Sequence, residues 1–119
     1  MRPVIEKVGS SQFILIVSRT QLKKSTINAN LLVRECFQQG GLVDFDELSP
    51  GEKKIMPCVM YISGEEIESQ VSLLIPKRRG KTQPEPRFWP YKLASLVDAG
   101  ASLWFTAKDG RLEVRDSIN

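Results

Sequence analysis

An Asp-Gly pair between two alternating runs is the feature that most constrains how this 119-residue chain can fold. Lys108-Asp109-Gly110 separates Ser102–Ala107 from Leu112–Arg115. Asp and Gly readily adopt the positive backbone angles of a type I′ turn, which is the turn that joins adjacent antiparallel strands. The pattern therefore predicts a β-hairpin over residues 102–115.

Other short strands are expected earlier in the chain. Ile55–Ile62 and Ile67–Pro76 flank Ser63-Gly64-Glu65-Glu66, which predicts a second hairpin. Phe13–Ser18 is apolar and β-branched, as buried strands are. Five or more short strands with one or two short helices indicate a β-rich barrel or sandwich.

Two segments have helical character and one does not. Leu31–Gln39 has apolar residues at positions 32, 33, 36 and 37, which is helical spacing, and Gly40-Gly41 ends it. Tyr91–Asp98 is expected to form a second, short helix. Arg19–Asn30 is polar and is expected to be a loop with some extended character.

The size and the longest apolar run limit where the chain can act. A chain of 119 residues fits one domain, here residues 1–119, that can bury its own core. The run Phe13–Val17 is far shorter than the roughly 20 apolar residues that a membrane helix needs. It also lacks the features of a secretory signal. We therefore expect a cytoplasmic protein with no membrane partner.

The residues for catalysis and metal binding are scarce. Histidine is absent, so the usual general base is missing, and Cys36 and Cys58 lack the spacing of a zinc site. We expect both cysteines to be reduced and mostly buried, because free cysteine behaves as a small core residue. The acidic cluster of Asp44, Asp46 and Glu47 is interpreted as a solvated loop. The sequence predicts a non-catalytic domain without a cofactor.

The positive charge is concentrated in one stretch, Lys77–Lys92, which reads KRRGKTQPEPRFWPYK. It holds six basic residues and one acidic residue. Residues 1–76 hold eight basic and nine acidic residues, and residues 93–119 hold three and four, so the rest is faintly acidic. A basic surplus gathered in one place is typical of a nucleic-acid contact.

Alternate residues within this stretch have side-chain types that can contact DNA bases. Pro84 and Pro86 bias the residues before them toward extended backbone, in which alternate side chains share a face. That face carries types that pair with guanine, adenine and cytosine edges in a major groove. The candidate base readers are Lys81, Gln83, Glu85 and Arg87. The alternatives are polyproline geometry, which would break the alignment, and a solvated proline-rich turn.

A second polar segment and the residues flanking the stretch supply candidate backbone contacts. Hydroxyl, amide and basic side chains commonly bind phosphates. The candidates are Arg19, Lys23, Lys24, Ser25, Thr26, Asn28, Asn30, Arg78, Arg79 and Trp89. Phe88, Trp89 and Tyr91 also permit a rival role in stacking single-stranded bases, although such residues more often close a barrel core.

The segment Val71–Arg87, VSLLIPKRRGKTQPEPR, resembles the N-terminal DNA-recognition domain of EcoRII-type restriction endonucleases. The shared pattern is Gly-Lys-Thr-x-x-Glu-x-Arg, here Gly80 to Arg87. Where that family often has a basic residue, this chain has Gln83 and Pro86. The stretch Lys23–Asn30 matches the family's N-arm but is shorter and lacks its histidine.

This resemblance implies a mainly β, B3-like pseudobarrel of about seven strands with two short helices. It implies a single, monomeric domain that grips the major groove of double-stranded DNA between an N-arm and a C-arm. The C-arm readers would be Lys81, Gln83, Glu85 and Arg87. The implied target is CCWGG, with cleavage performed by a separate domain of a larger type II enzyme.

Three functions therefore remain in competition. The leading one is sequence-specific binding of double-stranded DNA. The second is binding of single strands or RNA through exposed aromatic rings. The third is a protein-interaction module whose basic loop docks on an acidic partner.

Overall fold

The structure, a computed structural model, describes residues 4–117. In that range the strands are β1 (Ile5–Gly9), β2 (Gln12–Ile16), β3 (Ile27–Asn28), β4 (Lys53–Ile62), β5 (Glu65–Leu74), β6 (Arg87–Pro90), β7 (Ser102–Lys108) and β8 (Arg111–Arg115). The helices are α1 (Arg19–Lys24), α2 (Leu31–Gln39), α3 (Leu93–Leu96) and a 3₁₀ turn, η1 (Phe45–Glu47). The expected mainly β class is confirmed, with one strand and one α-helix more than predicted.

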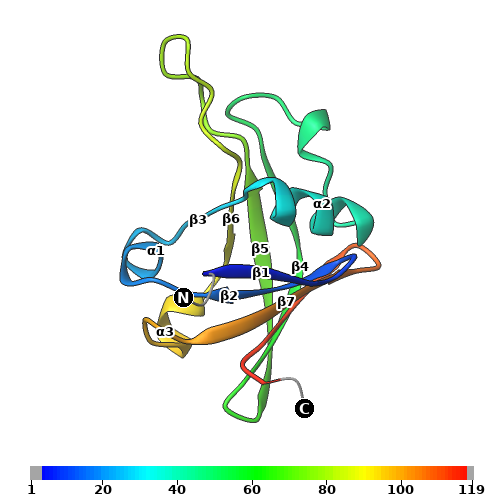
Figure 1. The fold of residues 1–119 in the computed structure, drawn as a ribbon, viewed down its shortest axis with the longest axis vertical. Coiled ribbons are helices and arrows are strands. Elements are labelled where there is room, and N and C mark those ends of the chain that lie inside the picture. The colour runs from blue at the N-terminus through cyan, green and yellow to red at the C-terminus, as the bar shows by residue number, and fades with distance from the viewer. Residues whose placement is uncertain (1–3, 118–119) are drawn as a thin grey trace.

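All eight strands belong to one sheet that curls into a half-barrel (Figure 1). Their order is β1-β2-β7-β8-β4-β5-β6-β3, and neighbours are antiparallel except for β4 and β8. The two-residue strand β3 forms one edge and pairs with β6. This pairing brings the polar segment of residues 19–30 beside β6, which lies within the basic stretch of residues 77–92.

Two tight turns fix the register of the longest strand pairs. Asp109 and Gly110 both have positive φ, 51° and 77°, between β7 and β8. Ser63 and Gly64 have φ of 53° and 78° between β4 and β5. Both turns therefore fit the type I′ preference, and both predicted hairpins are confirmed. The second turn is tighter than expected, because Glu65 and Glu66 already belong to β5.

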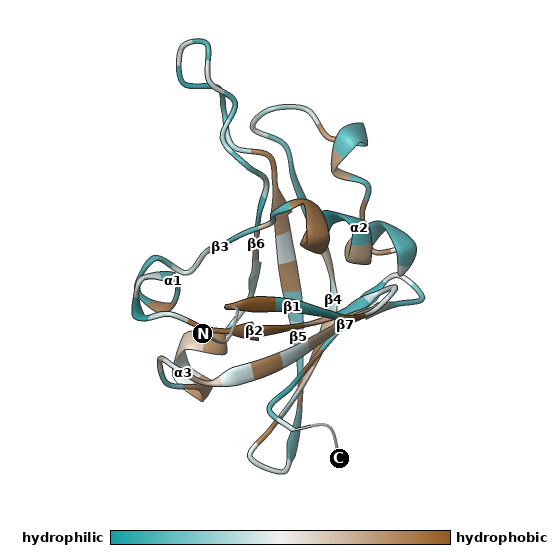
Figure 2. Ribbon diagram, in the orientation of Figure 1, coloured by the Kyte–Doolittle hydropathy of each residue, from teal (hydrophilic) through white to brown (hydrophobic). Residues whose placement is uncertain are grey.

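Four phenylalanines from distant parts of the chain meet inside the curled sheet. Phe13 of β2 stacks on Phe105 of β7 with centroids 5.0 Å apart. Phe37 of α2 meets the edge of Phe88 of β6, also at 5.0 Å. All four rings are essentially inaccessible to solvent. Figure 2 shows apolar residues along the strands and on α2, so this helix closes the core on one side.

Residues 19–30 differ from the expected loop. Ser18 Oγ accepts from the Gln21 amide at 3.1 Å, and Gln21 Oε1 accepts from the Ser18 amide at 2.8 Å. This reciprocal pair is a capping box, which starts α1 at Arg19. Ser25 then ends the helix with φ of 52°, and β3 follows. The prediction of a loop was therefore wrong for residues 19–24, where Ser18 and Gln21 start a helix, whereas the expected extended character is present in β3.

Both cysteines are free and buried, as predicted. Burial raises the pKa of the Cys58 thiol from its ordinary value of 9.0 to about 12. Burial also raises the pKa of the Cys36 thiol, partly offset by nearby Lys7. An apolar environment disfavours the thiolate, so both side chains act as core residues rather than nucleophiles.

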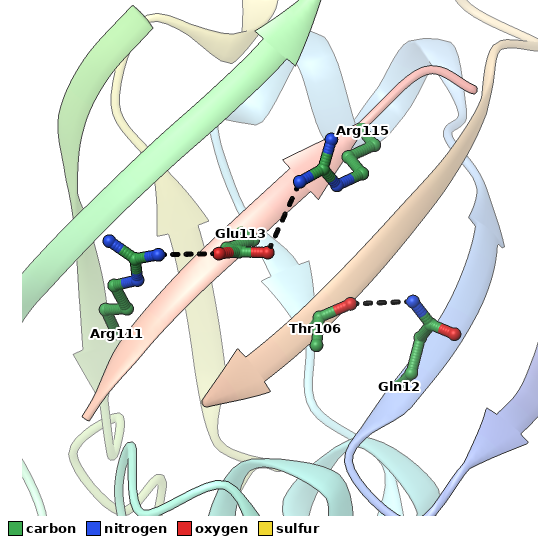
Figure 3. A network of polar contacts seen from close by, with 5 residues as sticks. All are labelled: Gln12, Thr106, Arg111, Glu113 and Arg115. Carbon is green, nitrogen blue, oxygen red and sulfur yellow. Dashed lines mark hydrogen bonds and ion pairs between the residues drawn. The ribbon is translucent and has the colours of Figure 1, made fainter. Parts of the chain in front are cut away.

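The outer face of the sheet is polar and internally paired around β8. Glu113 accepts from Arg111 at 2.8 Å and lies 3.7 Å from Arg115, while Gln12 donates to Thr106 at 2.8 Å (Figure 3). The guanidinium carbon of Arg115 lies 4.0 Å from the centre of the Tyr61 ring. Each of these three charges therefore has an opposite charge within 4 Å, with two arginines sharing Glu113.

Residues 4–117 contain neither a helix long and apolar enough to cross a membrane nor a cluster of potential metal ligands. None of the helices there reaches the length and apolarity that crossing a membrane demands. Within the same range, no three His, Cys, Asp or Glu side chains are grouped as metal ligands would be.

Candidate nucleic-acid interface

The basic stretch forms an arm, residues 77–86, that stands out from the body between the end of β5 and β6 (Figure 1). At its tip, the Arg79 amide donates to Thr82 O at 2.9 Å and the Thr82 amide donates to Arg79 O at 3.0 Å. Gly80, with φ of 63°, and Lys81 form the turn between them. The tip is thus a miniature hairpin, with Lys81 exposed at its end.

The four alternate side chains at positions 81, 83, 85 and 87 have different partners in the structure. The side-chain Nε2 of Gln83 donates to the carbonyl oxygens of Pro76 at 2.8 Å and Pro84 at 3.2 Å. This side chain therefore holds the arm's own backbone together. Glu85 Oε2 lies 3.9 Å from Arg34 Nη2 on α2. Arg87 lies beyond the arm, in β6. The four side chains therefore do not form one common edge, because Gln83 and Glu85 are held by the arm and by α2 while Arg87 belongs to the sheet.

The root of the arm is attached to the N-terminal polar segment by strand pairing. Arg87 pairs with Asn28 and Phe88 with Ile27, and the Ala29 amide donates to Pro86 O at 2.7 Å. Because directly opposed residues in antiparallel strands share a face, Asn28 and Arg87 lie side by side. The two polar segments that the sequence singled out therefore meet at this edge of the sheet.

A polar hollow of ≈ 430 Å³ lies where they meet, and we call it the basic cleft. Its walls come from α1, β3, the arm and β6. Its lining residues are Ser18, Thr20, Gln21, Lys24, Thr26, Asn28, Arg79 and Arg87. Among residues 4–117, three cationic side chains and no carboxylate contribute to this lining.

The cations of the basic cleft are not neutralised inside the fold. The ion pairs formed within residues 4–117 involve Arg34, Arg111 and Arg115, and none involves Lys24, Arg79 or Arg87. The side chains of Thr20, Thr26 and Asn28 also make no hydrogen bond with another described side chain or carbonyl. The cleft thus offers several unused donors next to three positive charges.

A second hollow of ≈ 450 Å³, the mixed pocket, lies elsewhere along the arm, against α2 and η1. Its lining combines an apolar floor with charges of both signs. The residues are Arg34, Phe45, Asp46, Leu48, Pro50, Ile75, Arg78, Gln83, Pro84, Glu85 and Pro86. Three predicted contact residues, Arg78, Gln83 and Glu85, therefore lie apart from the basic cleft.

A third, smaller hollow of ≈ 280 Å³ has lining residues in common with the basic cleft, and we call it the adjoining hollow. It shares Lys24, Thr26 and Arg87 with the cleft. Its other lining residues are Ser25, Lys53, Ser72, Leu74, Phe88 and Trp89. The indole of Trp89 is only 7% exposed, so it forms part of a wall rather than a free stacking surface.

Four predicted contact residues lie outside these hollows, and one of them is Lys81 at the exposed tip of the arm. Arg19 and Lys23 face α3, where they line a hollow with Leu22 and Val97. Asn30 Oδ1 accepts from the Val33 amide at 3.0 Å and thereby caps α2. The structure thus brings together Lys24, Ser25, Thr26, Asn28, Arg79, Arg87 and Trp89 from the predicted set.

Several lining residues were not singled out from the sequence. Ser18, Thr20 and Gln21 could have been found by reading the capping box as a helix start, which places them beside Lys24. Lys53 and Ser72 approach the cleft only because β5 pairs with β6, and the sequence carries no local signal for that pairing.

No protein-family model, curated protein or solved structure matches this chain. Function is therefore argued from the geometry and charge of these hollows.

Proposed function

We propose that this chain is a sequence-specific double-stranded DNA-binding domain, the B3-like recognition part of an EcoRII-like, CCWGG-type restriction endonuclease. Cleavage would belong to a separate domain, and this domain would hold and position the duplex. The observation that carries the proposal is the basic cleft, in which Lys24, Arg79 and Arg87 converge without a carboxylate among the described lining residues.

Three like charges around one hollow repel one another, and none of the three forms an ion pair with another described residue. Such an arrangement becomes favourable when a polyanion binds, since neutralising phosphates releases condensed counterions. Hydroxyl and amide groups from Thr20, Thr26 and Asn28 lie in the same cleft and suit phosphate oxygens.

The aromatic side chains favour a duplex over a single strand as the ligand. A single-strand site stacks bases on exposed rings. Phe88 is 1% exposed and Trp89 is 7% exposed, and both belong to the core. No aromatic residue within positions 4–117 is among the large exposed hydrophobic side chains.

We assign the recognition of bases to the arm, which has Lys81 at its exposed tip, and to Arg87, the β6 residue that directly follows the arm. The arm is narrow and stands clear of the sheet (Figure 1), as an element that enters a groove must. Glu85, half exposed beside Arg34, remains a candidate acceptor for a cytosine amino group.

The test is selection of bound sequences from random duplexes, followed by competition between the selected duplex and a scrambled one at physiological salt. We expect the selected duplex to bind at least about 1,000-fold more tightly. Equal affinity for both would contradict sequence-specific reading. No duplex binding at low salt, with binding of an acidic protein instead, would contradict the proposal as a whole.

A companion measurement addresses strand preference. Oligothymidine is expected to cause little quenching of tryptophan fluorescence, because Trp89 is only 7% exposed and Trp104 is partly buried in β7. Strong quenching by oligothymidine, without any preference among duplexes, would support a single-strand binder instead.

A further inference from the structure

A row of residues across four strands connects β4 to the basic cleft. Lys53 of β4 pairs with Leu74 of β5, and Leu74 pairs with Arg87 of β6. Arg87 in turn pairs with Asn28 of β3. Directly opposed residues share a face of the sheet, so Lys53 projects from the same face as Arg87 and Asn28. Two strand spacings separate Lys53 from Arg87, which is roughly 10 Å.

The next row shows that the neighbouring lysine points the other way. Lys54 pairs with Leu73, and Leu73 pairs with Phe88. Both of these partners are buried in the core. Lys54 therefore starts on the inner side of the sheet, although it is exposed at the end of its strand. Two adjacent lysines of equal charge thus lie on opposite faces.

Lys53 lines the adjoining hollow together with Lys24, Ser25 and Ser72. As in the basic cleft, the lining drawn from residues 4–117 contains no carboxylate. The two hollows share Lys24, Thr26 and Arg87, so positive charge and hydroxyl groups continue without interruption from Arg79 to Lys53. Lys53 forms no ion pair with another described residue.

We infer that the adjoining hollow is a second phosphate site, in which Lys53 binds a phosphodiester of the same DNA backbone that crosses the basic cleft. This inference rests on the proposed function, because it extends the path of the same ligand. Ser25 supplies a hydroxyl donor beside Lys53, whereas the Ser72 hydroxyl donates to Trp89 O at 3.5 Å, and Lys24 lines both sites. A phosphate contact adds affinity and fixes position, but it carries no sequence information directly.

The test compares Lys53→Gln with Lys54→Gln in the full chain, using duplex binding across a series of salt concentrations. Both substitutions remove one positive charge from adjacent exposed positions. For Lys53→Gln we expect the slope of log affinity against log salt to fall by about 0.9. Affinity should fall several-fold for selected and scrambled duplexes alike. Lys54→Gln should leave both the slope and the affinity close to those of the parent.

Each other outcome contradicts the inference. Equal losses in the two variants would mean that net charge, not a contact at Lys53, is responsible. No loss in Lys53→Gln would remove the second site. A loss confined to one base pair would make Lys53 a base reader. These outcomes all require that the parent binds duplex DNA, whereas a parent that does not bind contradicts the proposed function itself.

Discussion

Two hollows along the same arm differ in one respect above all, their balance of charge. The basic cleft and the mixed pocket have almost the same volume, ≈ 430 and ≈ 450 Å³. Three cations and no carboxylate from the described chain line the first, whereas Arg34 and Arg78 face Asp46 and Glu85 in the second. Hollows of equal size can thus be suited to different partners.

The same difference divides the residues of the basic stretch into two groups, those that stabilise the arm and those that remain available to a ligand. In the mixed pocket, Gln83 bonds to the arm's own carbonyls and Glu85 approaches Arg34. In the basic cleft, Arg79 and Arg87 have no such partners among residues 4–117. Neighbours in the sequence therefore divide into a group that shapes the arm and a group left free for a polyanion.

The comparison is tested most strongly by removing two charges from each hollow in turn. The double variant Arg79→Gln with Arg87→Gln should lose duplex affinity on the order of 100-fold, since a hydrogen bond to a charged group contributes roughly 1.5–3 kcal/mol. Its salt slope should fall by about 2. The measurement is fluorescence anisotropy of a labelled duplex over a salt series.

The matched control is Arg34→Gln with Arg78→Gln, which removes the same charge from the mixed pocket. We expect less than about a tenfold loss, because long-range attraction falls off within a Debye length of roughly 10 Å at 0.1 M salt. If the control loses as much affinity as the first variant, the distinction between the two hollows is wrong.

Alkaline pH tests the stability of the fold that supports both hollows, separately from their binding of DNA. The pKa of Cys58 is raised to about 12 in the folded protein, so its contribution to stability is complete below pH 9 and is lost as pH rises toward 12. Between these limits the free energy of unfolding should fall by up to about 1.4 kcal/mol per pH unit.

Urea unfolding at pH 8, 9 and 10 measures this effect, with Cys58→Ala as the comparison. The variant is less stable at every pH because it leaves a cavity, but its stability should depend less steeply on pH. Parallel pH profiles for parent and variant would show that Cys58 does not limit alkaline stability.

The smallest expected effect concerns the shape of the arm. Gly80 and Gly64 occupy turns with φ of 63° and 78°, and no other group lies within 4 Å of an added Cβ at either position. Alanine at either site should strain the backbone by roughly 1 kcal/mol. Only Gly80→Ala should also weaken duplex binding, by a few-fold, because it alters the arm.

Thermal unfolding and anisotropy distinguish the two glycine variants. Similar losses in Tm with different losses in affinity would support the arm as the DNA-entering element. An unchanged affinity in Gly80→Ala, at a temperature where both variants are folded, would contradict that role.

Local signals predicted much of the fold. The Asp109-Gly110 turn, the helix from Leu31 to Gln39 and burial of Phe88 all follow from turn chemistry, helical spacing and apolar character. β3 could not be expected in the same way. It is only two residues long and exists because Ile27 packs into the core beside Phe88.

The candidate site was predictable in composition but not in arrangement. The basic stretch and the polar segment at 19–30 were identified from charge and residue type alone. The turn at Gly80 and the bonds of Gln83 then divided the four alternate residues, which no period along the sequence could show. Lys53 was missed because the predicted strand began only at Ile55, and because Leu74, its partner, lies beside Arg87 through the β5–β6 pairing, which has no local signal in the sequence.

The miniature hairpin at the arm's end has a consequence for how such a domain could change its target. Its closure depends on backbone bonds between Arg79 and Thr82, while Lys81 and Thr82 are exposed and bear no part of the core. Residues there can be exchanged with little cost to folding, so new preferences can arise at the tip while the grip on the backbone stays constant. A library randomised at these two positions would exploit that independence.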